Sequence, residues 1–393
     1  MAAVASDVGT FLRGAREAHA DVSDDYARME ELYTRKLWHQ LTLAIAAFVA
    51  QPRLQGTDGD ELAQLYEHFI RHFELKMNSL SLAKLVIAIS RFFPAERASM
   101  FVSALVSKVS ADQEAVTLCK TEIARLKLKT GDVAGCKELL DEAQVTVDLL
   151  AGMDVDIHIS YYTTLAQYFK LQGPAMQFYK AALLLLSYQP LDKMEPSDAL
   201  TLSFDLGLAA LVAKSVYNFG ELLQHPIVAQ LESATEHAWL AQLLRVFNAG
   251  DIEMYEQLIG AHRAQLEAQP ALVAHAAFLK EKIALMSLME LVFGHVGPQA
   301  NHKLSFELVA QRVRLPVSEV ELLLMRAMSL ELVRGEIDEI DQIITVSWVQ
   351  PRVLTAAQVA SMAELLQGWK TQVGTSLLFL EAEAPEFGQD ANF

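Results

Sequence analysis

Residues 301–354 decide the fold of this chain, and their sequence is NHKLSFELVAQRVRLPVSEVELLLMRAMSLELVRGEIDEIDQIITVSWVQPRVL. A short extended piece, Leu304-Ser305-Phe306, opens the stretch. Apolar residues then recur at the spacing of a two-turn helix as far as Val313. Leu315-Pro316-Val317 ends that helix, because proline cannot continue the helical hydrogen-bond pattern. The stretch therefore begins with an extended piece, a short helix and a turn.

A second helix and two strands complete the stretch. Ser318 and Glu321 form the S-x-x-E capping box of a helix that runs to Leu330. Two runs with β character follow, the first from Leu332 to Ile337 and the second from Ile343 to Val349. Helix, turn, helix and hairpin in this order predict a winged helix.

The charges of the second helix argue against DNA as its target. A DNA-binding winged helix places this helix in the major groove, and affinity comes mainly from Lys and Arg that neutralise phosphates. Here Glu319 and Glu321 stand against the single Arg326. The outward positions Leu322 and Met325 are apolar. The sequence therefore favours a winged helix that contacts protein, with no nucleic acid as a partner.

Length, charge and cysteine content narrow the class of protein. The 393 residues exceed one compact core, so two or three structural units are expected. Lys plus Arg number 32 against 49 Asp plus Glu, and the net charge of −17 disfavours nucleic acid and anionic membranes as partners. Cys119 and Cys136 lie on helical patterns outside any C-x-x-C, which predicts buried, reduced thiols. No signal peptide or membrane-spanning run is visible, so we expect a soluble intracellular protein.

Residues 25–265 predict a solenoid of paired helices, preceded by a leader (1–24) that is frayed, partly helical or disordered. Gly131, Gly173 and Gly250 each follow the end of one helix and precede the start of another, as C-cap glycines do. Their spacings of 42 and 77 residues approximate one and two periods of about forty, which is typical of stacked helix pairs. This part of the chain is therefore expected to resemble tetratricopeptide repeats.

A long apolar helix precedes the winged helix, and another follows it. The first, from Ala271 to Phe293, joins the winged helix in one module over residues 266–354. The second occupies residues 355–380, with Thr355 and Gln358 as its cap. An acidic tail over residues 381–393 is expected to be disordered.

Apolar residues of the last helix form a narrow stripe. They step by three and four residues, as in a coiled-coil seam: Val359, Met362, Leu366, Trp369, Val373, Leu377 and Leu380. The stripe either folds back on its own domain or joins helices of other chains. Gly368 and Gly374 weaken the isolated helix, which favours completion by partners.

No catalytic or metal-binding pattern stands out. Phosphate-loop, dinucleotide-binding, nucleophile-elbow and zinc-protease motifs are absent from the sequence. His68 and His72 have a spacing that can share a metal, but no third ligand is evident and a solvated helix face explains them better. We therefore expect neither enzymatic activity, nor a metal, nor a cofactor.

The order of elements resembles the PCI-domain proteins, which are scaffold subunits of the proteasome lid, the signalosome and translation initiation factor three. The resemblance covers about residues 25–380. It becomes specific to one lid subunit at four segments: LYTRKLWHQLTL (32–43), VYNFGELLQHP (216–226), EVELLLMRA (319–327) and SWVQPRVL (347–354). It implies a mainly α fold, in which a helical-repeat solenoid leads into a winged-helix (PCI) domain and a C-terminal bundle helix.

The resemblance also implies a function and an interface. The function is that of a non-catalytic lid subunit of the regulatory particle, in the cytoplasm and nucleus, with other PCI and lid subunits as partners in ubiquitin-dependent degradation. In that family the winged helices pack side by side and the C-terminal helices gather into one bundle. An unpaired edge strand at Ile343–Val349 would then face a neighbouring winged helix. The interface residues expected on this basis are Ile343, Thr345, Ser347, Trp348, Val349, Val359, Met362, Leu366, Trp369, Val373, Leu377 and Leu380.

Two alternatives stay open on the sequence alone. One is a PCI subunit of the signalosome or of initiation factor three. The other is a winged-helix protein that binds nucleic acid, which would show salt-sensitive binding through residues 300–354.

Overall fold

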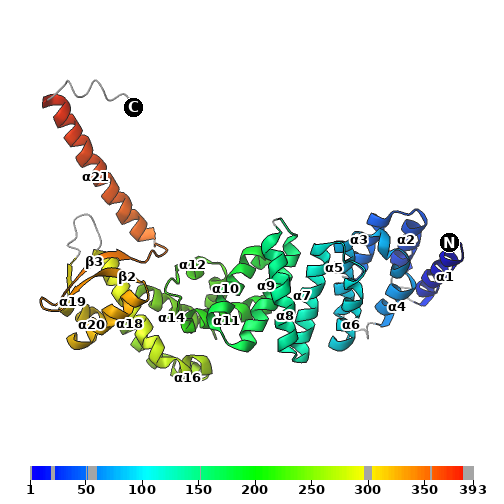
Figure 1. Ribbon diagram of the computed structural model, residues 1–393, viewed down its shortest axis with the longest axis horizontal. Helices are drawn as coiled ribbons and strands as arrows, with labels where there is room; N and C mark the ends of the chain where they lie inside the picture. The colour runs from blue at the N-terminus through cyan, green and yellow to red at the C-terminus, as the bar shows by residue number, and fades with distance from the viewer. Residues whose placement is uncertain are drawn as a thin grey trace. The chain divides into compact units, whose positions relative to one another are not determined.

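The computed structural model describes residues 2–18, 23–49, 51, 60–150, 152–295, 303–354 and 356–383. These residues are mainly helical, with a three-stranded sheet in the C-terminal part (Figure 1), so the predicted fold class is confirmed. The chain divides into two compact units, Met1–Glu195 and Pro196–Phe393. The sequence-based boundary at residue 265 stays a prediction.

The first unit is built of helices, and consecutive helices pack on one another from α5 to α10. Its elements are α1 (Ala2–Ala18), α2 (Ser23–Thr34), α3 (Trp38–Val49), α4 (Asp60–His68), the 3₁₀ turns η3 (Ile70–His72) and η4 (Glu74–Lys76), α5 (Ser79–Ser90), α6 (Ala95–Val106), α7 (Gln113–Thr130), α8 (Val133–Leu149), α9 (Val155–Gln172), α10 (Ala175–Tyr188) and the 3₁₀ turn η5 (Leu191–Lys193).

The N-terminal leader contributes to this unit. Residues 2–18 form α1, which packs on α2, and its Val8 and Leu12 side chains are each only 1% exposed. The leader is thus helical over the residues where it is described. The two thiols, Cys119 and Cys136, are free and buried as predicted, and burial raises the pKa of Cys119 to about 12.

Glycine caps end the helices at the predicted places. Gly131, Gly173 and Gly250 all have positive φ, at 88°, 90° and 63°, and they cap α7, α9 and α14 in the left-handed conformation. Glycine adopts this conformation without the penalty that a Cβ atom imposes. A Cβ at Gly250 would also lie 2.7 Å from Cα of Ser287, so this cap needs glycine for close packing as well.

The second unit contains helices and the sheet. Its elements are α11 (Pro196–Val212), α12 (Gly220–Gln224), α13 (Ile227–Ser233), α14 (Ala238–Ala249), α15 (Ile252–Ala261), α16 (Arg263–Glu267), α17 (Pro270–Ala274), α18 (Ala276–His295), β1 (Lys303–Ser305), α19 (Phe306–Val313), α20 (Val317–Ser329), β2 (Val333–Asp338), β3 (Ile343–Val349) and α21 (Ala356–Glu383).

Helix α18 forms the core of the second unit. The predicted single helix from Ala271 to Phe293 is broken at His275, which caps α17 before α18 begins. Every residue from Lys282 to Met289 is buried. A helix buried on all sides is apolar all round, which explains why this segment lacks a polar face.

Lys282 is the one charged residue in that buried run. Its Nζ donates hydrogen bonds to the carbonyl oxygens of Ala210, Leu211 and Ala213, at 2.8, 3.0 and 2.8 Å. These carbonyls lie at the end of α11, where the helix leaves acceptors without an internal donor and the dipole favours a cation. Burial lowers the pKa of Lys282 to about 7. The lysine thus joins α18 to the C-terminus of α11.

The winged helix has the predicted elements with one difference. Helix α19 runs from Phe306 to Val313 as expected, and its N-cap Ser305 accepts a hydrogen bond from the Leu308 amide at 3.3 Å. Helix α20 begins one residue earlier than predicted, with Pro316 as N-cap and no side-chain cap. The predicted Ser318 capping box is therefore wrong, because proline already sets the start of the helix.

Candidate protein-interaction surfaces

The sheet does not present the strand that the sequence placed at its edge. The strand order is β1-β3-β2, so β3 (Ile343–Val349) is the central strand. It pairs with β2 along its whole length, and Lys303–Ser305 pair with Ile343–Thr345 on its other side. The expectation of an unpaired edge is wrong for Ile343–Thr345, because β1 returns from before α19 to cover them. Within the described residues, Val346–Val349 have no strand partner on that side.

The predicted interface residues of β3 lie instead on the faces of the sheet. Thr345 and Ser347 are exposed, and Ile343, on the same side as Thr345, is half-buried. Val349 is also half-buried, but it pairs with the buried Val333 on the core side. Side chains alternate along a strand, and those of Ile344 and Val346 point into the core. Trp348 is half-buried beneath the guanidinium of Arg334, which lies 4.8 Å from its ring centroid. A partner could thus reach Thr345 and Ser347 across the open face.

Besides the three-residue edge strand β1, the sheet has a longer edge strand, β2. Its exposed residues are Arg334, Glu336 and Asp338, and a bulge interrupts the register between Arg334 and Gly335. Charges and bulges on an edge strand oppose unselective pairing with other sheets. Any strand that adds to this edge must therefore carry matching charges.

Two arginines of the winged helix are paired with carboxylates. Arg326 of α20 lies 2.9 Å from Glu281, and Arg314 lies 2.8 Å from Glu253 and 3.4 Å from Glu256. Leu322 and Met325, on the outer face of α20, are 66% and 47% exposed. The face that would enter a DNA groove is thus apolar and acidic, as the sequence indicated.

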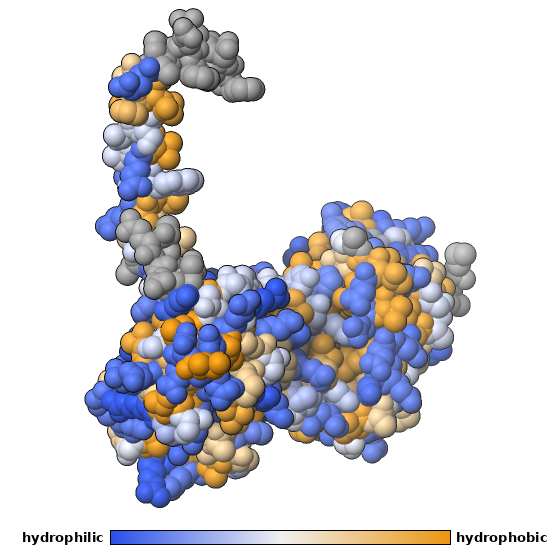
Figure 2. Space-filling model, turned by 60° about the vertical axis from the view of Figure 1, so that its left-hand side comes forward, coloured by the Kyte–Doolittle hydropathy of each residue, from blue (hydrophilic) through white to orange (hydrophobic). Residues whose placement is uncertain are grey.

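The seam residues of α21 are exposed along the whole helix. Figure 2 shows orange, apolar residues exposed along α21 among its polar residues. Their exposed fractions run from 47% to 66% for Val359, Met362, Leu366, Trp369, Val373, Leu377 and Leu380. The stripe does not fold back on its own domain, which removes one of the two alternatives.

The apolar surface of α21 is wider than the predicted seam. Leu365, Leu378 and Phe379 are 52%, 67% and 64% exposed, and none of them belongs to the three-four stepping pattern. Four consecutive apolar residues, Leu377 to Leu380, therefore surround the helix near its end. The signal that could have found them is this unbroken run, which is inconsistent with a single narrow seam.

A polar cluster holds the segment from which α21 begins. The Arg352 guanidinium pairs with Glu290 of α18 and donates to the carbonyl oxygen of Asn248 at 3.3 Å. Gln358, in the first turns of α21, donates to the same glutamate at 3.5 Å. The Arg352 side chain is only 9% exposed. This cluster links the root of α21, the segment that contains Arg352 and Gln358, to α14 and α18. Thr355, the predicted cap, lies outside the described residues.

The described residues contain no group of three or more His, Cys, Asp or Glu side chains that could hold a metal ion. His68 is used in packing, since its ring centroid lies 5.4 Å from that of Phe11. Across those same residues, every helix is too short or too polar to cross a membrane.

Comparison with known proteins indicates a family for this chain. The family of PSD13 N-terminal repeats matches residues 25–244, and the PCI domain matches residues 259–348. The chain is 37% identical over 382 residues to the 26S proteasome non-ATPase regulatory subunit 13 homolog B of Arabidopsis thaliana, covering 96% of this chain and 98% of that protein.

Relatives from two other organisms are also named as proteasome regulatory subunits. Identity is 35% to the 26S proteasome non-ATPase regulatory subunit 13 of Dictyostelium discoideum, over 94% of this chain and 96% of the relative. It is 33% to the 26S proteasome regulatory subunit RPN9 of Saccharomyces cerevisiae, over 93% and 95%. The chain belongs to the proteasome regulatory subunit 13 family.

Within the subunit 13 family, the two domain matches leave two described elements of this chain wholly uncovered, α1 and α21. The repeat match ends within α14 and the PCI match ends at residue 348, inside β3. Helix α21 therefore lies beyond both matches, although the full-length relatives extend over nearly all of this chain. The exposed apolar stripe of α21 is therefore outside the named domains of this family member.

Proposed function

We propose that this chain is a non-catalytic scaffold subunit of the proteasome regulatory-particle lid, and that α21 is its main attachment to other subunits. The observation that carries the proposal is the apolar surface of α21, uncovered from Val359 to Leu380. The names of the full-length relatives support the choice of complex. The proposed partners are the other PCI and lid subunits.

The size of the uncovered surface favours a stable contact over a transient one. Burying one large apolar side chain contributes roughly 1.5–3 kcal/mol. The seam alone offers seven such side chains: Val359, Met362, Leu366, Trp369, Val373, Leu377 and Leu380. Association costs on the order of 4–15 kcal/mol in lost freedom, so burial of this stripe is large enough to offset it.

The form of the surface favours a bundle over a pair of helices. A two-stranded coiled coil buries only a narrow seam and leaves the opposite face polar. Near its end α21 is apolar on all sides, from Leu377 to Leu380. Helices from more than one partner are needed to cover such a turn.

The winged helix supplies a second proposed contact. We propose that the exposed Thr345 and Ser347 meet a neighbouring winged helix, together with the half-buried Ile343, Trp348 and Val349. The charged edge of β2 limits which neighbour can add a strand. This contact would set the order of subunits, while α21 supplies most of the affinity.

The alternatives have less support. The paired arginines and exposed Glu319 leave little cationic surface for nucleic acid on the winged helix. The proteasome relatives extend over nearly the whole chain, which favours that complex over other PCI assemblies. A place in ubiquitin-dependent degradation, in the cytoplasm and nucleus and without catalysis by this chain, follows from the proposal.

The test is the incorporation of a tagged chain into its complex. The variant Met362→Asp, Leu366→Asp and Trp369→Asp places three charges on the seam, and we expect it to lose co-purification of the lid by about tenfold or more, since each buried charge is costly. Affinity purification followed by quantitative mass spectrometry measures the loss.

A matched control separates the seam from charge in general. Ser361→Asp, Gln367→Asp and Gln372→Asp add the same three charges at exposed positions outside the seam. This control should incorporate normally. Equal incorporation of both variants would show that α21 does not attach the subunit.

A further inference from the structure

A groove on the first unit lies outside all the surfaces described above. It has a volume of about 560 Å³ and runs between α3 and α5. Its lining comes from these two helices alone: Thr42, Leu43, Ala46, Val49, Ser81, Lys84, Leu85, Ala88, Arg91 and Phe92. The groove belongs to neither the sheet nor α21.

Small side chains on facing helices create the hollow. Ala46 of α3, with Ser81 and Ala88 of α5, fills little of the space between the two helices. Leu85 and Val49 form a buried apolar floor, 3% and 5% exposed. Leu43 stands at the margin and is 58% exposed. The groove is therefore apolar inside and open to solvent.

The length of the groove matches a short helix. Its α5 lining repeats at Ser81, Lys84, Leu85, Ala88, Arg91 and Phe92, which is one continuous face of that helix. These positions span roughly 16 Å at about 1.5 Å per residue. Three turns of a partner helix have the same length, and an apolar stripe on such a helix suits a groove of this kind.

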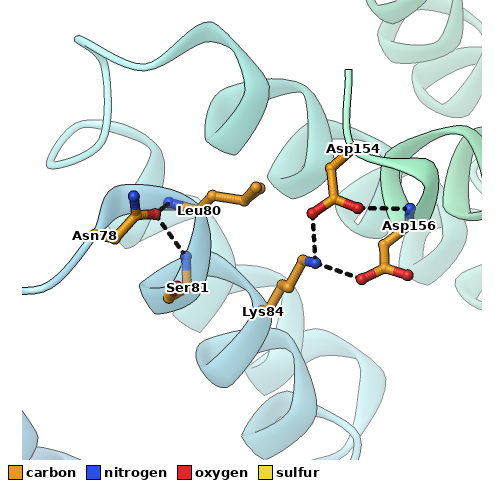
Figure 3. A network of polar contacts seen from close by, with 6 residues as sticks. All are labelled: Asn78, Leu80, Ser81, Lys84, Asp154 and Asp156. Carbon is orange, nitrogen blue, oxygen red and sulfur yellow. Dashed lines mark hydrogen bonds and ion pairs between the residues drawn. The ribbon is translucent and has the colours of Figure 1, made fainter. Parts of the chain in front are cut away.

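Lys84, in the middle of the groove, is already engaged. Figure 3 shows its Nζ between the carboxylates of Asp154 and Asp156, at the start of α9. The Lys84–Asp154 distance is 2.8 Å. Burial acts against the charged form, but hydrogen bonds to the two aspartates raise the pKa of Lys84. This lysine joins α5 to α9 and is not available to a ligand.

Unpaired positive charge lies at the C-terminal end of the groove. Arg91 is part of the lining, and Lys129 of α7 is close enough to Arg91 to feel its charge but is not part of the lining. Arg91 and Lys129 are exposed, and within the described part of the chain neither has a carboxylate at ion-pair distance. Arg125, beside them, is paired with Glu122. The pKa of Lys129 is lowered by the charge of Arg125, by burial and by the charge of Arg91, against a raising contribution from Glu122. In a chain of net charge −17, this crowding of cations is a local exception.

We propose that the groove between α3 and α5 binds an amphipathic helix of a partner protein, with acidic residues where that helix meets Arg91 and Lys129. The apolar floor takes the apolar face of the helix, and the two free cations select carboxylates at one end. The proposal concerns the first unit and stands apart from the scaffold role given to α21.

The probe is a fluorescein-labelled synthetic peptide of about sixteen residues, with Leu on one helical face and Glu elsewhere, long enough to cover the groove. Fluorescence anisotropy against the full chain measures its affinity. We expect saturable binding that weakens between ~50 mM and ~300 mM salt, because screening reduces the attraction of exposed charges. A peptide with Lys in place of each Glu should bind at least about tenfold more weakly.

Variants of the full chain place the binding in the groove. Arg91→Glu reverses a free cation, and Ala88→Trp fills the hollow; each should weaken binding by about tenfold. Lys137→Glu, an equal charge change at an exposed site on α8, should leave it unchanged. Circular dichroism and the thermal midpoint identify any variant that fails to fold, and Arg91, being exposed, is the safer of the two.

Three results would overturn the proposal. The first is absence of binding by the acidic peptide. The second is loss of binding only when Leu366→Glu is introduced, which would place the peptide on α21. The third is concentration-dependent self-association of the chain that Ala88→Trp abolishes, which would assign the groove to a second copy.

Discussion

Helices α18 and α21 belong to the same unit and are both long and rich in apolar residues, yet their environments are opposite. Every residue of α18 from Lys282 to Met289 is buried, whereas every described side chain of α21 from Val359 to Phe379 is exposed apart from Gly374. The first helix is the centre of its own unit. The second has no cover within this chain.

This contrast shows that apolar composition alone does not determine whether a helix is buried by its own chain or by another chain. The two helices differ in the polar contacts that they make with the rest of the unit. Lys282 is matched to three carbonyls of α11 inside the unit. Helix α21 has polar contacts to the rest of the unit at its root, through Gln358 and the neighbouring Arg352. The predictions below test the contrast, from the largest expected effect to the smallest.

Lys282→Ala should give the largest loss of stability. It leaves three buried carbonyls without their donor and opens a cavity, which together cost about 4 kcal/mol. Lys280→Ala, an exposed position on the same helix, should change stability by less than about 0.5 kcal/mol. Urea unfolding followed by circular dichroism compares the two. Similar urea midpoints for Lys282→Ala and Lys280→Ala would show that the buried contacts of Lys282 do not stabilise the unit.

The same substitution in the two helices should have different consequences. Leu285 in α18 is fully buried, and Leu285→Ala should cost about 3 kcal/mol. Leu366 in α21 is 60% exposed, and Leu366→Ala should cost less than about 0.5 kcal/mol in the free chain. The measurement is again the urea midpoint. A large loss for Leu366→Ala would mean that α21 packs on its own unit in solution.

Breaking the polar contacts at the root of α21 should cause an intermediate loss of stability. Arg352→Met removes the partner of Glu290, which is about three-quarters buried, and should cost about 2 kcal/mol. Hydrogen exchange should rise at residues 350–358 and stay unchanged near β2. Arg334→Met, which removes an exposed cation from the same sheet, is the control. Equal exchange in both variants would show that the cluster does not hold the root.

The smallest effect should be the pH dependence of the Lys84 contact. The hydrogen bond from Lys84 holds the pKa of Asp154 below its ordinary value of 3.8, and the pKa of Lys84 lies above 10.5. The contact therefore stabilises the fold between these values and is lost as pH falls through the folded pKa of Asp154. Thermal midpoints of the parent and Lys84→Met should differ at pH 7 and converge as the pH falls below 3.8, through the lowered pKa of Asp154. A constant difference would exclude this titration.

Local patterns predicted most of the fold correctly. The bounds of α19, the two strands of the hairpin and the caps at Gly131, Gly173 and Gly250 all depend on neighbouring residues or on a backbone conformation that favours glycine. The break at His275 was missed, because the apolar pattern continues through it. Such a break depends on packing and leaves no strong mark in the sequence.

The candidate interface could be predicted only in part. The extended piece near Leu304 was recognised, but its pairing with β3 joins segments about forty residues apart, and no local rule specifies that pairing. The part of β3 that β1 covers, Ile343–Thr345, was therefore wrongly expected to be an open edge. For α21 the stepping pattern predicted the seam, and the exposure of the helix required the three-dimensional structure.

The uncovered stripe of α21 has a consequence for how the protein must be made. A newly synthesised copy exposes apolar side chains to water along α21. At high concentration such copies will aggregate with one another or with other proteins. Production in isolation should therefore give poor yields, which co-expression with the natural partners should restore.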